Sequence, residues 1–257
     1  MNLIAPSAAA WASAGDGPGV LVLHGFTGNP TSLRPLAERI AAEGYAVELP
    51  RLPGHGTSPQ DLATTAWHDW LAEATRALDR LDGRPRAIVG LSMGGALALR
   101  LAQLRRDDVA ALVLINPSVT FKHPLKPVLG LLKRVVPSLP GVGNDIAKPG
   151  ADELPYARVP LRAAASLFEL QDIVRDHLAA IDMPTLIFTS RSDHTVRPSD
   201  STLVLERIAA TRREQLWLER SFHVATLDYD ADLIADRTIA WLDDTTRSAG
   251  PDGRAPR

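Results

Sequence analysis

The chain has 257 residues, of which 45% are hydrophobic and 23% charged, and its formal net charge is -2. This length and apolar content suit one large domain, or a domain with a small insertion, around a sizeable core. The near-neutral charge argues against a nucleic-acid partner, which usually binds a basic face. The chain contains no cysteine, which excludes disulfides, thiolate metal sites and cysteine nucleophiles.

The N-terminal residues lack the basic region of a signal peptide, and no apolar run approaches the roughly 20 residues that span a bilayer. We therefore expect a soluble, cytoplasmic protein that can also lie at the periphery of a membrane. The sequence gives no indication of its oligomeric state.

Short β-rich runs alternate with longer stretches of helical periodicity along most of the chain. The expected strands are residues 20–24, 45–49, 87–90, 111–115, 185–190 and 214–218. The expected helices are residues 32–43, 67–81, 93–104, 199–209 and 231–243. This alternation predicts an α/β fold with a mostly parallel sheet and helices on both of its faces.

The alternation stops after Asn116, where prolines and short apolar stretches replace the regular pattern. We therefore expect an α/β core formed by residues 1–116 and 181–245, with a small helical cap inserted at residues 117–180. The polar tail, residues 246–257, is rich in Gly and Pro and is expected to be disordered.

The segment from Gly90 to Gly95 contains the pattern G-x-S-x-G, with Ser92 at its centre. It follows an expected strand and begins an expected helix, which is the context that this nucleophile turn requires. Small residues are needed on both sides because the turn is tight, and the free N–H groups of the following helix favour developing negative charge. Ser92 is therefore the predicted nucleophile.

A nucleophilic serine needs a base, and the base needs a carboxylate that orients it. In this architecture the order along the chain is Ser, acid, His, with each residue beyond the carboxyl end of a strand. Asp193 follows the strand that ends at Ser190, and His223 follows the strand of residues 214–218. The spacing predicts a triad of Ser92, Asp193 and His223.

Other residues compete for these roles. His24 and His55 are expected to support loops at the site rather than to act as the base, and His194 directly adjoins Asp193. Asp200 is the main rival acid, but its place at the start of a helix predicts a capping role. The sequence contains no His and carboxylate cluster with the spacing of a metal site, and the reaction needs no cofactor.

An acyl-transfer enzyme must also stabilise an oxyanion. The Gly-rich loop from His24 to Gly28 follows the first strong strand, where this fold places one donor. The predicted donors are the backbone N–H groups of Phe26 and Met93, so their side chains only shape the pocket.

These motifs, with the segment from Leu216 to Asp228, resemble those of the bacterial monoacylglycerol lipases and of the related small carboxylesterases. The likeness extends from about Gly19 to Leu242. It implies an α/β-hydrolase fold and hydrolysis of one ester bond beneath a small cap, releasing glycerol and a free fatty acid by way of an acyl-enzyme. It also implies that Glu153 helps to hold the glycerol head group, beside Val142, which replaces a larger isoleucine of those lipases.

Three alternatives remain. A broad carboxylesterase for short acyl chains would use the same triad, as would a thioesterase, lactonase or perhydrolase. A catalytically inactive binding protein is the most remote reading. For the lipase reading, the apolar cap could contact a membrane or micelle transiently, with Lys126, Lys133 and Arg134 meeting anionic head groups. The sequence leaves acyl-chain preference open.

Overall fold

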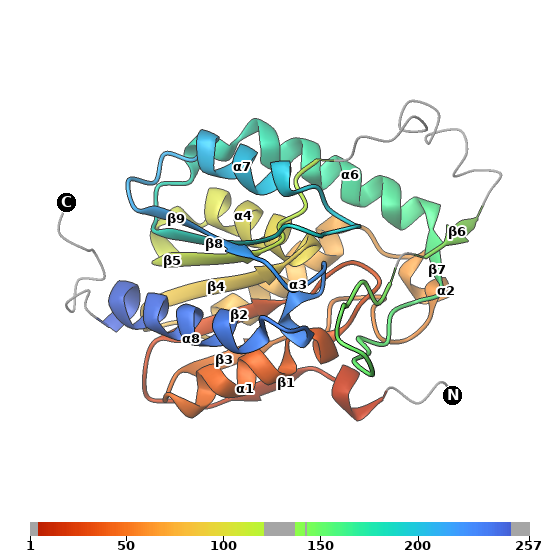
Figure 1. Ribbon diagram of the computed structural model, residues 1–257. Helices are drawn as coiled ribbons and strands as arrows, with labels where there is room; N and C mark the ends of the chain where they lie inside the picture. The colour runs from red at the N-terminus through yellow and green to blue at the C-terminus, as the bar shows by residue number, and fades with distance from the viewer. Residues whose placement is uncertain (1–4, 121–136, 142, 248–257) are drawn as a thin grey trace.

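The computed structural model describes residues 5–120, 137–141 and 143–247. Its centre is a seven-stranded sheet with the order β1-β3-β2-β4-β5-β8-β9 (Figure 1). The strands are β1 (Trp11–Ser13), β2 (Gly19–Leu23), β3 (Ala46–Leu49), β4 (Arg86–Leu91), β5 (Ala111–Ile115), β8 (Thr185–Ser190) and β9 (Arg213–Leu218). β1 pairs with β3 in the antiparallel direction, and all other pairs in this sheet are parallel.

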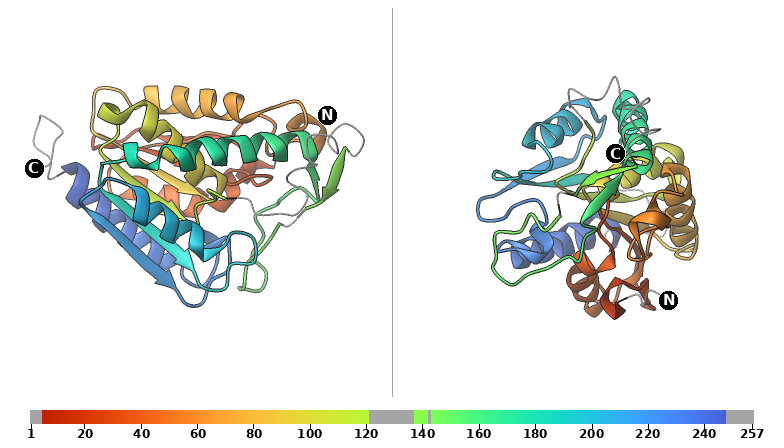
Figure 2. Two further views of the ribbon diagram at one scale, coloured as in Figure 1. Left: turned by 90° about the horizontal axis from the view of Figure 1, so that it is seen from above. Right: turned by 90° about the vertical axis from the view of Figure 1, so that its right-hand side faces the viewer.

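Helices cover both faces of the sheet (Figures 1 and 2). They are α1 (Arg34–Ala42), α2 (Pro59–Leu62), α3 (Trp67–Asp79), α4 (Met93–Leu104), α6 (Leu161–Asp176), α7 (Pro198–Arg207) and α8 (Ala231–Leu242). Shorter helical turns are η1 (Pro6–Ala8), η2 (Pro30–Ser32), η3 (Arg106–Asp108), η5 (Leu178–Ala180), η6 (Ala225–Leu227) and η7 (Asp243–Arg247).

Alternate residues of the central strands face two separate apolar layers. In β2, Leu21 and Leu23 belong to the core layer that includes α3, α4 and α6, whereas Val20 and Val22 belong to the layer with α1 and α8. Successive side chains of a strand point to opposite faces, so a strand that is buried on both faces is apolar throughout. This burial fixes the sheet between its two helical layers.

The region between β5 and β8 contains a short antiparallel pair, β6 (Ser138–Pro140) and β7 (Arg158–Pro160), followed by α6. α6 contributes Ala163, Leu167 and Leu170 to the same core layer as α3 and α4. Helix α6, which lies within the predicted cap, therefore packs against α3 and α4. The division of the chain into core and cap stays a prediction. The apolar residues 129–136 of the predicted cap lie outside the described residues.

The predicted α/β fold is confirmed, and all six expected strands and five expected helices are present with ends shifted by at most two residues. β1, α2, β6 and β7 were not predicted, and α6 was predicted only as part of the helical cap at residues 117–180. Of the predicted tail, residues 246 and 247 belong to η7, and residues 248–257 lie outside the described part of the chain.

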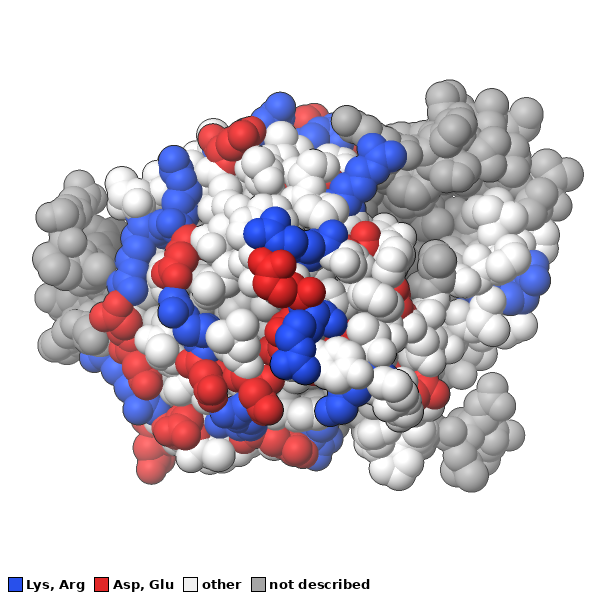
Figure 3. Space-filling view, viewed as in Figure 1, with Lys and Arg blue, Asp and Glu red and all other residues white. Residues whose placement is uncertain are grey.

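The surface in the view of Figure 3 intermixes Lys and Arg with Asp and Glu, and neither sign dominates that face. Within the described residues, no helix combines the length and the apolar character needed to cross a membrane.

Candidate active site

Ser92 lies in the tight turn between β4 and α4. Its backbone has φ 56° and ψ -117°, a conformation that costs a non-glycine residue on the order of 1–3 kcal/mol. The turn is bonded to the end of β5 and the residues after it, since the Ser92 N–H donates to the Ile115 carbonyl at 3.0 Å and the Ser92 carbonyl accepts the Ser118 N–H at 3.2 Å. Ser92 is 8% exposed, so this turn presents a largely shielded hydroxyl at the carboxyl end of the sheet.

The glycines of the motif are required by close contacts between backbones. A Cβ atom on Gly94 would lie 2.0 Å from the Leu23 carbonyl oxygen, and one on Gly90 would lie 2.4 Å from the Gly94 carbonyl oxygen. Any side chain at either position would force β2, β4 and α4 apart. The G-x-S-x-G pattern is therefore a steric condition for the Ser92 turn.

Asp193 and His223 form a buried pair. Oδ2 of Asp193 accepts a hydrogen bond from Nδ1 of His223 at 2.7 Å, and the two side chains are only 2% and 8% exposed. The other carboxylate oxygen of Asp193 accepts the N–H groups of Thr195 at 2.8 Å and Val196 at 2.7 Å. These bonds leave Nε2 of His223 as the nitrogen that can accept a proton. Within the described residues, no hydrogen bond joins it to the Ser92 hydroxyl, although such contacts often form only when substrate binds.

The pKa of His223 reflects opposing effects. Burial lowers it, but the hydrogen bond and charge of Asp193, with the charges of Glu153 and Asp145, outweigh burial and raise the pKa above the usual 6.5. Histidine is the side chain whose charge changes in the physiological pH range, which suits it to general base catalysis near pH 7.

This pKa predicts an acidic limit to activity. Below its pKa His223 is protonated and cannot accept the serine proton, so kcat/KM for an uncharged ester should fall about tenfold per pH unit on the acidic side. We expect this acidic limb of the pH–rate profile to have its midpoint above pH 6.5, the usual histidine pKa. A rate profile on such an ester checks this, and activity that is unchanged down to about pH 4 would contradict His223 as the base.

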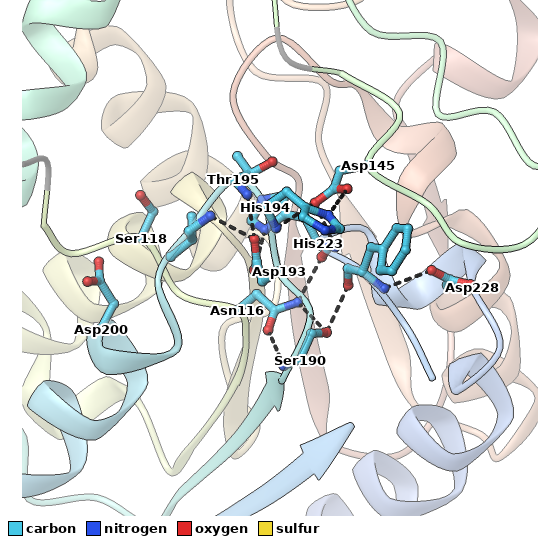
Figure 4. Close-up of polar contacts among 12 residues, drawn as sticks. Asn116, Ser118, Asp145, Ser190, Asp193, His194, Thr195, Asp200, His223 and Asp228 are labelled. Atoms are coloured by element: carbon cyan, nitrogen blue, oxygen red, sulfur yellow. Dashed lines mark hydrogen bonds and ion pairs between the residues drawn. The ribbon is translucent and has the colours of Figure 1, made fainter. Parts of the chain in front are cut away.

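Two buried polar residues hold the histidine loop (Figure 4). Nδ2 of Asn116 donates to the His223 carbonyl at 2.8 Å and to Oγ of Ser190 at 3.0 Å. The hydroxyl of Ser190 in turn donates to the Phe222 carbonyl at 2.8 Å. Because the Ile115 carbonyl also holds Ser92, the end of β5 fixes both the nucleophile turn and the histidine loop.

Asn116 and Ser190 were predicted only as element boundaries and not as functional residues. The sequence does contain a feature that indicates such a role, because each is a polar residue at the carboxyl end of a buried parallel strand. This is the edge at which α/β folds place their sites.

The predicted oxyanion loop lies against the nucleophile. A Cβ atom on Gly25 would be 3.5 Å from Cβ of Ser92. Among the described residues, neither the N–H of Phe26 nor that of Met93 donates to another group of the protein. Met93 is the first residue of α4, whose initial N–H groups have no partner within the helix. Both donors are thus free to bind an oxyanion, and their role stays a prediction.

Two buried histidines support loops at the site, as expected. Nδ1 of His24 donates to the Gly25 carbonyl at 2.9 Å, and Nε2 accepts the Leu52 N–H at 3.1 Å. His55 binds the Pro53 carbonyl through Nδ1 at 3.0 Å. Burial lowers the pKa of His24 to about 4 and also lowers that of His55. Both rings are therefore neutral near pH 7 and do not compete with His223 as a base.

Glu153 is buried beside the oxyanion loop. It is 8% exposed, and its Oε1 accepts the Asn144 N–H at 3.0 Å. Its Oε2 would lie 3.2 Å from a Cβ atom on Gly28, so this oxygen faces the loop. Burial raises the pKa of Glu153 above its usual value. Val142, the other predicted head-group contact, lies outside the described residues.

Asp200 does not cap its helix, so that prediction was wrong. The residue lies in the first turn of α7, but its carboxylate accepts the N–H groups of Val119 at 2.9 Å and Thr120 at 2.7 Å. The chain after β5 passes close enough to bind the carboxylate instead, which a sequence pattern within α7 cannot indicate. Within residues 5–120, 137–141 and 143–247, no group of three His, Cys, Asp or Glu side chains could hold a metal ion.

Comparisons with known proteins agree with this geometry. A family model described as serine aminopeptidase, S33 (Hydrolase_4) matches residues 18–230. The chain belongs to this family. A thermostable monoacylglycerol lipase of Bacillus sp. (strain H-257) is 40% identical over 232 residues, which cover 88% of this chain and 91% of the relative. A carboxylesterase of Bacillus subtilis (strain 168) is 25% identical over 89% of this chain and 94% of its own length.

Solved structures place this Hydrolase_4 chain in the α/β-hydrolase fold. A structure described among metagenome-derived lipolytic enzymes superposes with a TM-score of 0.91 at 38% identity, covering 94% of this chain and all of that one. A monoacylglycerol lipase of Paleococcus ferrophilus superposes with a TM-score of 0.77 at 18% identity, covering 92% of this chain and 99% of that one, and shows the same fold. The predicted family and fold are therefore confirmed, and the chain is a serine hydrolase that acts on esters.

Proposed function

We propose that this Hydrolase_4 protein is a monoacylglycerol lipase in which Ser92 attacks the ester carbonyl. His223 takes the serine proton, Asp193 orients the imidazole, and the N–H groups of Phe26 and Met93 bind the oxyanion. Glycerol leaves with the proton from His223. Water, activated by the same histidine, then releases the fatty acid from the acyl-enzyme.

The observation that carries the glyceride assignment is the position of Glu153. A buried carboxylate with one oxygen held by Asn144 and the other facing Gly28 is an acceptor for hydroxyl groups next to the oxyanion loop. A monoacylglycerol has two free hydroxyl groups beside its ester, whereas a simple alkyl ester has none. This proposal also agrees with the 40% identity to a thermostable monoacylglycerol lipase.

Glu153→Gln tests this assignment. The amide keeps Oε1 for the Asn144 N–H but removes the charged acceptor, and a hydrogen bond to a charged group contributes about 1.5–3 kcal/mol. We expect kcat/KM for a monoacylglycerol to fall about 10- to 100-fold. Activity on a simple ester of the same acyl chain should change little.

The matched control for Glu153→Gln is Asp152→Asn, which neutralises the neighbouring, exposed carboxylate. Its amide oxygen can still accept the Leu154 N–H that Oδ1 accepts at 2.7 Å. A matched panel of mono-, di- and triacylglycerols and short simple esters completes the test. Equal losses on both substrate classes, or fast turnover of short esters with little glyceride cleavage, would favour the broad carboxylesterase instead.

We also propose transient contact of the lipase with a membrane or micelle through residues 117–180. Leu139 and Leu154 in this region are 39% and 43% exposed, which supports an apolar contact. The basic residues Lys126, Lys133 and Arg134 lie outside the described residues. Co-sedimentation of Leu139→Ser/Leu154→Ser with anionic vesicles tests the contact, and unchanged binding would exclude these side chains. The cytoplasmic location stays a prediction that cell fractionation tests.

A further inference from the structure

Asp145 lies between the two loops that carry Asp193 and His223, although it belongs to the long connection between β5 and β8 (Figure 4). Its Oδ2 accepts the backbone N–H of His194 at 3.0 Å and that of His223 at 3.3 Å. Its Oδ1 contacts Nδ1 of His194 at 2.8 Å. One carboxylate thus bridges the residue next to the predicted acid and the predicted base itself.

A second set of bonds fixes Asp145 relative to the histidine loop. The Asp145 carbonyl accepts the Val224 N–H at 3.1 Å. Two and three residues further on, the N–H groups of Ala147 and Lys148 donate to the buried carboxylate of Asp228 at 2.7 and 3.0 Å. Asp228 also accepts the Phe222 N–H at 2.9 Å. The connection and the histidine loop therefore hold each other on both sides of His223.

The residue before Asp145 is tied to the head-group carboxylate. Oδ1 of Asn144 accepts the Glu153 N–H at 2.9 Å, and the Asn144 N–H donates back to Oε1 of Glu153 at 3.0 Å. Asn144 adopts φ 57°, which turns the chain so that Asn144 and Asp145 face different partners. Two consecutive residues thus connect Glu153 with the loops of Asp193 and His223.

We propose that Asp145 is a positioning residue of the hydrolase, one that holds the loops of Asp193 and His223 at the separation at which their side chains bind each other. This proposal rests on the proposed function of the triad. Asp145 acts on His223 from the backbone side and through its charge, and it takes no part in proton transfer.

Its charge has a separate, measurable effect. The carboxylates that face His223 are Asp193 from the loop after β8, and Glu153 and Asp145 from the connection between β5 and β8. All three favour the protonated imidazole, so loss of the Asp145 charge lowers the pKa of His223. The acidic limb of the rate profile should then move to lower pH.

Asp145→Asn is the decisive variant. It removes the charge and directs an amide NH2 group at a site where both carboxylate oxygens now accept bonds. We expect kcat to fall about 10- to 100-fold on both a simple ester and a monoacylglycerol, because a small displacement of a catalytic group costs up to about 100-fold. KM should stay within about twofold, and the acidic limb should move to lower pH.

Asp145→Glu and Asp152→Asn complete the experiment. The first keeps the charge on a longer side chain, so it should restore the acidic limb without restoring kcat in full. The second removes an exposed carboxylate from the same connection and should leave both quantities unchanged. Thermal unfolding of every variant shows whether it is folded.

The proposal would be overturned if folded Asp145→Asn had the kcat of the wild type and the same acidic limb in its pH–rate profile. A fall in kcat with an unmoved limb would also overturn it, because it would indicate only a structural role. Failure of the glyceride assignment would appear separately, as poor hydrolysis of monoacylglycerols by the wild type. Failure of the triad assignment would appear as activity that survives Ser92→Ala.

Discussion

Ser92→Ala should abolish ester hydrolysis, with kcat reduced by about 10⁴- to 10⁶-fold, because no other nucleophile occupies the turn between β4 and α4. The variant removes only the hydroxyl oxygen and keeps the Cβ atom that Gly25 faces. The oxyanion donors and the pair of Asp193 and His223 should stay in place, so substrate binding should persist while acyl transfer stops. Initial rates on a simple ester and a monoacylglycerol measure the loss.

Covalent labelling separates loss of the nucleophile from loss of the fold. A fluorophosphonate probe should label the wild type and leave Ser92→Ala unlabelled, while both proteins unfold at similar temperatures. An unlabelled wild type would favour the catalytically inactive binding protein. Labelling of Ser92→Ala, or hydrolysis by it well above background, would identify a different nucleophile.

Asp193→Asn is expected to lower kcat by about 10³- to 10⁴-fold with little effect on folding. The carboxylate accepts the Nδ1 proton of His223 at 2.7 Å, which leaves Nε2 free to accept the serine proton. An amide in its place can donate to Nδ1 and select the tautomer with the proton on Nε2, which cannot act as a base. It also removes the charge that stabilises the imidazolium. Kinetics on a simple ester measure the loss, which should appear in kcat more than in KM.

Asp200→Asn is the matched comparison, because Asp200 was the rival acid and is also buried. Its carboxylate anchors Val119 and Thr120, so neutralising it should lower thermal stability while kcat stays near that of the wild type. The reverse pattern, with kcat lost in Asp200→Asn and retained in Asp193→Asn, would move the acid of the triad to Asp200.

Much of this molecule could be predicted because its elements obey local rules. Strands that are buried on both faces, such as β4 and β5, appear as continuous apolar runs, and helix α4 begins where the glycines of the nucleophile turn end. The order Ser, acid, His then selected Asp193 and His223 before their contact was known. Local pattern and position in the fold were sufficient for these residues.

The remaining features depend on contacts between distant segments. Asn116 binds the His223 carbonyl 107 residues away, and Asp145 binds the His223 N–H 78 residues away. Asp200 resembles a helix cap in sequence, yet its partners lie 80 and 81 residues earlier. The predicted helical cap includes α6, but the packing of α6 against α3 and α4 could not be predicted from its own residues. A single sequence carries no signal for such pairings.

The long separations within the site also bear on how activity is acquired during folding. The bond from Asn116 closes a loop of more than a hundred residues, and contacts of high sequence separation form late because chain entropy opposes them. The loops that bear Ser92, Asp193 and His223 follow β4, β8 and β9, so all three loops come together only when these strands have aligned in the sheet. Recovery of esterase activity on refolding should therefore coincide with completion of the whole sheet, and a partly assembled chain should have no partial activity.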